Sequence, residues 1–199
     1  MTGGGTFSGA TLDEALSRAS ASLHARLGEL RYEVGEGEDG GRVAIRAEVD
    51  PMAVVGLFLV ETCRASELDI KVGLREGADG LEGELSGEDV RLLTASGGQG
   101  LDALQYLCNR VLNRRLAEHP PVRLDCAGFK ARRARQLEER ARAAAEEVSR
   151  RGSPVILGPL TPAARREVHL ALANHPAVET ESDGEGFFKR VVVRPRRRS

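Results

Sequence analysis

Helix-start signals are the feature that most limits how this chain can fold. Thr11 opens a capping box of sequence T-L-D-E, and the pairs Asp50-Pro51 and Thr161-Pro162 each join an N-cap residue to a proline at the first helical position. Short strand-forming runs, bounded by glycine and proline, lie between the helices that these signals open. The 199 residues suffice for one large domain or for two to three small ones. The alternation of short elements predicts an α+β protein built from three small modules.

The first predicted module, residues 1–49, places one helix on a few strands. The spacing of its leucine and alanine residues predicts a helix over residues 12–27, ended by Gly28. Residues 30–34 and 42–49 are expected to be strands, joined by an acidic, glycine-rich turn. Such a module has too little core to be very stable by itself.

The second predicted module, residues 50–126, has the order helix, strand, strand, helix, loop, helix, strand. The last of its helices keeps a helical spacing of apolar residues and is ended by Pro120 and Pro121. The expected helices span residues 51–64, 89–94 and 99–117, and the expected strands span residues 68–75, 81–85 and 122–126.

The third predicted module, residues 127–199, packs helices on a small sheet. Its first helix has an apolar stripe of alanine, leucine and valine and is ended by Gly152. The chain closes on the sequence R-P-R-R-R-S at residues 194–199, which predicts a disordered basic tail. The expected helices span residues 129–150 and 162–174, and the expected strands span residues 154–157, 178–181 and 190–193.

Composition and missing motifs exclude several classes of protein. No apolar run reaches the roughly 18 residues that a membrane span needs, and the glycine-rich start lacks the features of a signal peptide. Cys63, Cys108 and Cys126 are far apart and form no C-x-x-C pair, so neither a zinc site nor a disulfide framework is expected. The four histidines show no metal-ligand spacing, and no catalytic motif is present. We expect a reduced, cytoplasmic protein with no cofactor, no metal and no enzymatic activity.

The net charge of −1 hides a strong asymmetry between the two halves of the chain. Residues 1–100 hold 9 basic and 18 acidic side chains, whereas residues 101–199 hold 20 basic and 12 acidic ones. A basic half indicates a polyanionic partner. Nearly all the basic residues are arginine, whose planar group matches phosphate, although a high genomic GC content also replaces lysine by arginine. Both explanations of the arginine content stay open.

Two features could bind phosphate. The glycine-bearing loop at residues 95–98 precedes a helix, and such a loop brings backbone N–H groups close to an anion, although it is often only a turn. Arg165 and His169 lie four residues apart, so they share one helix face beside the apolar stripe and can both reach the sheet edge. Two donors at such a border could hold a phosphate. The structural alternative is that His169 bonds a backbone carbonyl and Arg165 pairs with a carboxylate.

The exposed side of the helix at residues 129–150 is expected to neutralise itself. Its arginines stand four residues from glutamates, and the expected pairs are Arg135 with Glu139 and Arg142 with Glu146. This spacing favours a solvated face over a nucleic-acid track. Better basic candidates stand at the start of that helix, at Lys130 and Arg133, and in the segment Lys189-Arg190.

An ordered series of short motifs resembles the bacterial Jag proteins, also called the SpoIIIJ-associated or KhpB family. The segment Asp102-Ala-Leu-Gln-Tyr-Leu107 after a glycine loop is similar to their K-homology (KH) domain, here of type II with the order α-β-β-α-α-β. The third module is similar to their single-stranded nucleic-acid-binding domain, named R-three-H for its Arg-x-x-x-His motif. The capped helix after Phe7-Ser-Gly-Ala resembles their N-terminal domain. The motifs of the third module are Leu124-Asp125, Phe129-Lys130-x-x-Arg133, Leu157-x-Pro159-Leu160-Thr161, Arg165-x-x-x-His169, Val178-Glu-Thr-Glu-Ser-Asp-Gly-Glu185 and Arg190-Val-Val-Val193.

The resemblance implies a bacterial RNA-binding protein linked to post-transcriptional control of envelope growth or division. The ligand would be single-stranded RNA, or single-stranded DNA, and the partner a small protein with a single KH domain. The implied contacts, together with the basic candidates above, are Arg165, His169, Arg166, Lys130, Arg133, Lys189 and Arg190. With no tryptophan and few other aromatic residues, broad stacking platforms are not expected, and binding should be electrostatic and weakly sequence-specific.

The family's G-x-x-G phosphate-clamping loop falls on Ala95, Ser96, Gly97 and Gly98, where this chain departs from the pattern. Ala95 replaces the first glycine, and the usual basic residue of the loop is absent. The alternative is therefore an interaction protein whose KH module forms a homodimer or recruits a protein partner, with RNA binding incidental. A nucleic-acid-processing enzyme is a further alternative.

Overall fold

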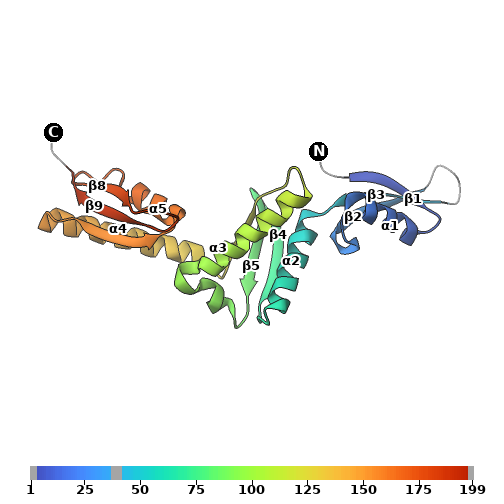
Figure 1. The fold of residues 1–199 in the computed structure, drawn as a ribbon, viewed down its shortest axis with the longest axis horizontal. Coiled ribbons are helices and arrows are strands. Elements are labelled where there is room, and N and C mark those ends of the chain that lie inside the picture. The colour runs from blue at the N-terminus through green and yellow to red at the C-terminus, as the bar shows by residue number, and fades with distance from the viewer. Residues whose placement is uncertain (1–3, 37–41, 197–199) are drawn as a thin grey trace. The chain divides into compact units, whose positions relative to one another are not determined.

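A computed structural model describes residues 4–36 and 42–196, and it confirms the α+β class. The described chain forms three separate three-stranded sheets, each with at least one helix packed on it (Figure 1). It divides into two compact units, residues 1–127 and residues 128–199. The expected division of the first unit at residue 49 stays a prediction. No helix within the described residues is long and apolar enough to cross a membrane.

The first sheet pairs its three strands antiparallel in the order β1-β3-β2, with α1 packed on β1 and β3. Its core consists of small and branched residues that include Ala15, Ala19 and Ile45. The strand β1 was not expected from the sequence. The expected end of the helix at residue 27 is wrong, because His24 already adopts a left-handed conformation and caps the helix. The elements are β1 (Gly4–Gly9), α1 (Leu12–Leu23), β2 (Leu30–Glu36) and β3 (Val43–Val49).

The middle sheet has the order β4-β5-β6, with β4 and β5 antiparallel and β5 and β6 parallel. The order of its elements agrees with the sequence expectation. The two helices expected on either side of residues 95–98 are confirmed, because the backbone of these four residues is not helical; both helices are included in α3, which is kinked between them. The elements are α2 (Pro51–Ala65), β4 (Lys71–Gly77), β5 (Gly80–Ser86), α3 (Val90–Arg115) and β6 (Val122–Asp125).

The kink in α3 depends on glycine. Ser96, Gly97 and Gly98 have φ values of 51°, 73° and 84°, a left-handed region that favours glycine. At Gly100, a Cβ atom would lie 3.1 Å from the Cα atom of Leu93, so the two halves of α3 approach each other closely only because this residue has no side chain. The sequence therefore turns the chain at the loop and restarts the helix immediately afterwards.

The third sheet has the order β7-β9-β8, all antiparallel, and α4 and α5 pack on one face of it. Figure 1 shows α4 running along this sheet. The elements are α4 (Phe129–Arg151), β7 (Val155–Leu160), α5 (Pro162–Leu172), β8 (Val178–Asp183) and β9 (Lys189–Pro195). The core consists of the buried residues Leu137, Ala141, Ala144, Ala145, Val148, Leu157, Val168, Leu172, Val178, Val191 and Val193.

Two details of the third module differ from the sequence expectation. The disordered tail was placed to begin at Arg194, but β9 extends to Pro195, and the backbone N–H of Arg196 donates to the carbonyl of Ala177. The remainder of that tail, residues 197–199, lies outside the described residues. On α4, Arg142 pairs with Glu138 at 2.5 Å instead of with Glu146, so the exposed face is partly self-neutralised through a different partner.

Candidate nucleic-acid interface

The side chains that β8 directs toward α5 change from apolar to polar along the strand. Val178 is fully buried, and Thr180 and Ser182 follow it at intervals of two, on the same face. The register confirms this face, because Thr180 pairs with Val193 and Ser182 pairs with Val191, and both valines belong to the core. The apolar core therefore gives way to two hydroxyl groups at the end of an edge strand.

The helix α5 places Arg165 and His169 opposite these hydroxyls. Its start is fixed by Thr161, whose side chain accepts a hydrogen bond from the N–H of Ala164, and by Pro162. Because Val168 is buried in the core, the neighbouring face that carries Arg165 and His169 borders the edge of the sheet. Both side chains are half-buried, as the spacing in the sequence predicts.

Three hydrogen bonds connect the helix to the strand. Nδ1 of His169 lies 2.6 Å from Oγ1 of Thr180, and its Nε2 lies 3.1 Å from Oγ of Ser182. Nη1 of Arg165 donates to the same Ser182 hydroxyl at 3.1 Å. The sequence left open that His169 bonds a backbone carbonyl and that Arg165 pairs with a carboxylate. Both expected partners are wrong, because the two side chains bond hydroxyl groups instead. Among the described residues, no acidic side chain forms an ion pair with either of them.

The electrostatics of the couple favour a neutral imidazole. Burial and the nearby Arg165 guanidinium both lower the pKa of His169 from its ordinary value of 6.5. A neutral imidazole has one donor and one acceptor nitrogen, which matches two hydroxyl partners. Nε of Arg165 is buried and has no hydrogen-bond partner within the described residues. Unsatisfied buried donors are uncommon, and they are often found at functional sites.

The other basic residues predicted from the sequence lie on α5 and on both faces of the sheet at β9. Arg166 follows Arg165 on α5 and is exposed. Lys189 pairs with Leu160 and shares the helix side of β9 with Val191. Arg190 lies on the opposite face, where it forms an ion pair with Asp183 at 2.8 Å. The structure therefore places Lys189 on the helix side of the sheet and Arg166 on the exposed side of α5, and it does not bring Arg190 to the helix side of the sheet.

Lys130 and Arg133 lie in the first turns of α4 and are half-buried. The guanidinium of Arg133 stands over the ring of Phe129, 5.7 Å from its centroid, which is a cation–π arrangement. The strand β7 begins four residues after α4 ends and runs back along it, so the end of β7 and the start of α5 lie toward the first half of α4. Lys130 and Arg133 therefore belong to the same unit as Arg165 and His169, but they lie on α4 and not on α5.

The glycine loop of the other unit has a suitable backbone shape but lacks cationic side chains. Ala95, Ser96, Gly97 and Gly98 form the kink of α3, and three consecutive left-handed residues turn the chain there. Asp89 at the start of α3 accepts a hydrogen bond from the N–H of Asp69 at 2.8 Å, so a carboxylate lies within the preceding helical turn and a half. Nucleic-acid binding by this loop stays a prediction.

The boundary between the two units also separates the charges. Residues 1–127 hold 13 basic and 21 acidic side chains, a net charge of −8, and residues 128–199 hold 16 basic and 9 acidic ones, a net charge of +7. The unit that carries the Arg165–His169 couple is therefore the cationic part of the chain. Within the described residues, no group of three or more His, Cys, Asp or Glu side chains is placed to hold a metal ion.

Comparison with known proteins places this site in a family. The R-three-H domain model matches residues 135–195, a range that includes both members of the couple. An RNA-binding protein KhpB from Clostridium symbiosum is 31% identical to this chain over 199 residues, covering 94% of this chain and 90% of that protein. The chain belongs to the KhpB family. The resemblance to the Jag proteins that the sequence motifs indicated is thereby confirmed.

Two further KhpB-family relatives carry the name RNA-binding protein KhpB. The one from Lactiplantibacillus plantarum is 31% identical over 161 residues, which is 81% of this chain and 48% of that protein. The one from Bacillus subtilis is 27% identical over 158 residues, which is 78% of this chain and 76% of that protein. This chain therefore spans about half the length of the Lactiplantibacillus relative and most of the other two.

Sequence reasoning missed the two hydroxyl groups that hold the couple. The expected strand ended at residue 181, one residue before Ser182, so the alternation of Val178, Thr180 and Ser182 was cut short. A signal was present, because residues at intervals of two from a buried valine lie on the core face of a strand. Extending that alternation to the next glycine would have placed both hydroxyls opposite α5.

Proposed function

We propose that this protein binds single-stranded RNA on the face formed by α5 and the end of β8, and that it does so without catalysing a reaction. The observation that carries the proposal is the Arg165–His169 couple, which Ser182 holds half-exposed at the rim of the core. The net charge of +7 on residues 128–199 and membership of a family whose relatives are named RNA-binding proteins support it.

The Arg165–His169 couple would bind the phosphate backbone of the RNA more than its bases. Arginine presents a planar set of donors to phosphate oxygens, and Arg166 on α5 and Lys189 on β9 add positive charge in the same unit. His169, kept neutral by its surroundings, would hold Ser182 and so fix the direction of the Arg165 guanidinium. Lys130 and Arg133 would extend the contact to neighbouring phosphates, whereas Arg190 is paired with Asp183 on the other face of the sheet. Phosphate contacts position a strand and carry little sequence information.

The test is the affinity of the full chain for a fluorescein-labelled 12-nucleotide RNA, measured by anisotropy. Arg165→Ala combined with His169→Ala is expected to weaken binding at least tenfold, because the variant lacks both the guanidinium that binds phosphate and the imidazole that orients it. The matched control is Arg194→Ala, since Arg194 belongs to the same unit but pairs with Glu179 and Glu181 on the other face of the sheet. Equal affinity of the double variant and the wild type would exclude this site.

Salt dependence gives a second test. With about six phosphate contacts, the slope of log K against log salt for a single strand is roughly −4, which is a loss of a few hundredfold between about 50 and 200 mM salt. Single-stranded DNA and duplex RNA of the same sequence serve as competing ligands, and a single RNA strand should compete best. An almost flat salt response would contradict a phosphate-based interface.

The absence of catalysis is a separate part of the proposal. It rests on the lack of catalytic motifs in the sequence and on the names of the relatives. Purified protein incubated with labelled RNA and Mg²⁺ is expected to leave the RNA intact. Reproducible cleavage that the Arg165→Ala and His169→Ala substitutions abolish would make the protein a nuclease.

The KH module is proposed to bind a protein, either a second copy of this chain or a small partner with a single KH domain. The observation that favours this second function is the exposure of Tyr106 and Leu107 on α3, whose side chains are 62% and 45% accessible. Tyr106→Arg should convert any dimer seen by light scattering into a monomer, while RNA affinity per chain stays the same. An unchanged mass would exclude this surface as the contact of a homodimer.

The cellular role is proposed to be post-transcriptional control of envelope growth or division in the bacterial cytoplasm. Its support is membership of the KhpB family. Crosslinking of RNA to the protein in cells, followed by mapping of the crosslinked peptides and transcripts, tests both the site and the regulated messages. Crosslinked peptides confined to residues 1–127 would contradict the proposed interface.

A further inference from the structure

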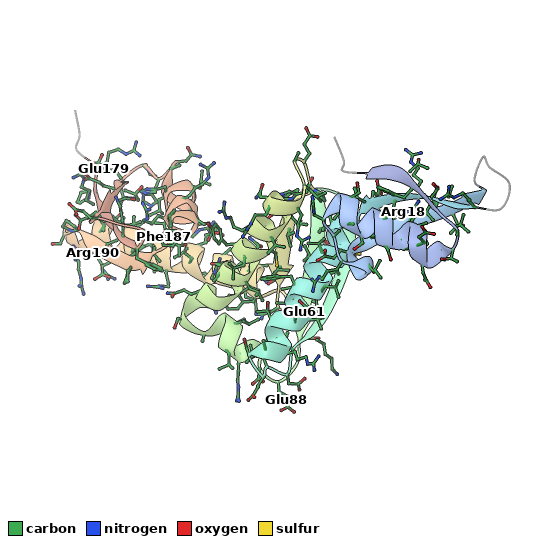
Figure 2. All side chains as sticks on the ribbon, turned by 45° about the vertical axis from the view of Figure 1, so that its right-hand side comes forward. Arg18, Glu61, Glu88, Glu179, Phe187 and Arg190 are labelled. Carbon is green, nitrogen blue, oxygen red and sulfur yellow. The ribbon has the colours of Figure 1, made fainter. Side chains whose placement is uncertain are left out.

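Two adjacent phenylalanines are exposed at the tip of the hairpin that joins β8 to β9. The side chains of Phe187 and Phe188 are 62% and 44% accessible. Their ring centroids lie 5.1 Å apart with an angle of 82° between the ring planes, an edge-to-face arrangement. Each ring therefore limits the motion of the other, while large parts of both stay open to solvent. Figure 2 labels Phe187 within this unit.

Core packing does not account for this pair. Gly184 and Gly186, with φ values of 107° and 78°, turn the hairpin sharply, and a Cβ atom at either position would meet nothing within 4 Å. The tip is thus an open turn, in which polar residues are the ordinary choice. Scattered single apolar residues on a surface need no explanation, but two neighbouring aromatic rings in contact form a small apolar patch.

The backbone places the pair at the same end of the sheet as the Arg165–His169 couple. The tip begins directly after Asp183, next to the Ser182 hydroxyl that both members of the couple contact. On its other side, Lys189 pairs with Leu160, which stands immediately before Thr161, the N-cap of α5. The aromatic rings therefore lie close to both the hydroxyl site and the start of α5 along the backbone.

Cationic groups lie near this position along the chain, together with the exposed carboxylate of Glu185 and the Asp183–Arg190 ion pair. Lys189 follows the pair directly, and the 11-residue helix α5 begins with its positive end two residues after Leu160, the partner of Lys189 in the sheet. Arg165 and Arg166 lie in the first two turns of this helix. A ligand that fits must combine negative charge with flat, apolar faces. Single-stranded nucleic acid has both, because its phosphates alternate with bases that each present a π-face.

We propose that Phe187 and Phe188 form a stacking site for one or two unpaired bases of the strand whose phosphates contact α5. This inference rests on the proposed function and deepens it by adding a base-binding element to a phosphate-binding one. Phenylalanine orders only two side-chain torsions on binding, so a pair that is already packed edge to face loses little entropy. The small number of aromatic residues argues against a broad platform, and a local pair at the site is compatible with that composition.

The two contributions respond differently to salt, which makes them separable. Phosphate contacts release counterions and set the slope of log K against log salt, whereas stacking is nearly independent of salt. The double substitution Phe187→Leu with Phe188→Leu keeps apolar side chains but removes the π-faces. We expect it to lower the affinity for the 12-nucleotide RNA about tenfold at every salt concentration and to leave the slope unchanged. Arg166→Ala, in contrast, should make the slope shallower by roughly one phosphate contact.

The matched control is Leu170→Ala. Leu170 lies on α5 in the same unit and is 62% accessible, the same as Phe187, but it is not aromatic and is absent from the β8–β9 hairpin. Its substitution should leave the affinity unchanged. Circular dichroism and thermal unfolding of all variants verify that any loss of binding does not reflect loss of the fold.

A site-specific fluorophore reports stacking directly. The chain contains no tryptophan, so Phe188→Trp introduces a single indole at the tip and also serves as the conservative rescue variant. An RNA of 12 nucleotides should quench its emission and bind with wild-type affinity or better. An abasic oligonucleotide of the same length, which keeps the phosphates and lacks the bases, should bind the wild type about tenfold more weakly and cause no quenching.

The outcomes separate this inference from the function on which it rests. If the wild type binds the RNA and the abasic strand equally, or if the double leucine variant binds like the wild type, the stacking site is excluded and phosphate binding stands. If the double variant loses binding to vesicles of anionic phospholipid while its RNA affinity is unchanged, the pair belongs to a membrane contact and the inference is overturned. If the wild type binds neither oligonucleotide, the proposed function itself fails.

Discussion

The Ser182 hydroxyl lies 3.1 Å from Nε2 of His169. The same oxygen accepts a hydrogen bond from Arg165, so one small side chain on an edge strand joins the two residues that name the domain. Because a hydroxyl has one proton and two lone pairs, it can serve both partners at once. The orientation of the couple therefore depends on β8 as much as on the helix that carries it.

Removing this hydroxyl should affect both stability and binding. Ser182→Ala leaves Arg165 and His169 without their shared partner, and an unsatisfied, partly buried polar group costs about 1–3 kcal/mol. We expect the midpoint of urea unfolding of residues 128–199 to fall accordingly, and the RNA affinity to fall with it. Ser149→Ala is the control, because that serine lies on the exposed side of α4 and bonds only the carbonyl of Ala145. Equal midpoints for the Ser182 and Ser149 variants would contradict the bridging role.

The lowered pKa of His169 predicts a dependence of stability on pH. The unfolded chain takes up a proton on this histidine near pH 6.5, whereas burial and Arg165 resist that proton in the folded state. The folded state is therefore favoured above about pH 6.5 and loses this advantage as the pH falls further. We expect the thermal midpoint of the wild type to decrease between pH 7 and pH 5, and this decrease to be smaller for His169→Gln.

The control for the pH experiment is His119→Gln in the other unit. His119 contacts the carbonyl of Pro120 and takes no part in the couple, so its substitution should leave the pH dependence of residues 128–199 as it is in the wild type. A pH profile of His169→Gln that is parallel to the wild type would show that this imidazole does not titrate differently in the folded and unfolded states.

Local signals in the sequence predicted the starts of the helices better than the rest of the fold. Thr11, Asp50 and Thr161 all make the expected capping hydrogen bonds. Such bonds involve residues two or three apart, so they can be recognised without any knowledge of the fold. The strand β1 was missed because its sequence, G-G-T-F-S-G, has a low intrinsic preference for strand structure. It forms because β3 offers a complete pairing edge, and that partner lies more than 30 residues away.

In the candidate site, too, the features that depend on local sequence were predicted and those that depend on strand pairing were not. The spacing of Arg165 and His169 was sufficient to place them on one face of a helix, because that face depends only on helical geometry. Their partners could not be assigned so easily, since Thr180 and Ser182 become neighbours of α5 only when β8 pairs with β9. The separation of Lys189 from Arg190 likewise follows from the register of the sheet and not from their adjacency in the sequence.

The buried thiols should be inert in the folded protein. Burial raises the pKa of Cys108 to about 12 and also raises the pKa of Cys63, and Cys126 is buried as well. Because the thiolate is the reactive form, native protein at pH 8 should react with Ellman's reagent only slowly. In 6 M guanidinium all three thiols should react at once, because only hyperstable domains have an unfolding midpoint above about 5 M. Ser149→Cys supplies an exposed thiol as the positive control. Fast reaction of one native thiol would show that its part of the core opens.

Glu29 is a fully buried carboxylate at the point where the first sheet meets α3. The backbone N–H and Nε of Arg26 both donate to it at 2.9 Å, and Nη1 of Arg115 on α3 lies 3.3 Å from it. The same Nη1 atom donates to the carbonyl of His24. Only 1% of Glu29 is accessible, so its charge is compensated almost entirely by these partners.

Glu29→Ala should therefore destabilise the first unit by about 3 kcal/mol, because it removes the buried acceptor of the Arg26 backbone N–H and of Arg26 and Arg115, which keep only Glu61 and the carbonyl of His24. The measurement is the free energy of unfolding of the full chain in urea, together with hydrogen exchange at residues 24–30, which should become faster as the contact to Arg115 is lost. Glu33→Ala is the matched control, since Glu33 lies exposed on β2 and its loss should change stability by no more than about 0.5 kcal/mol. RNA affinity should be the same in both variants, because neither residue belongs to the cationic unit. If Glu29→Ala and Glu33→Ala unfold at the same urea concentration, the buried carboxylate does not hold the two parts of this unit together.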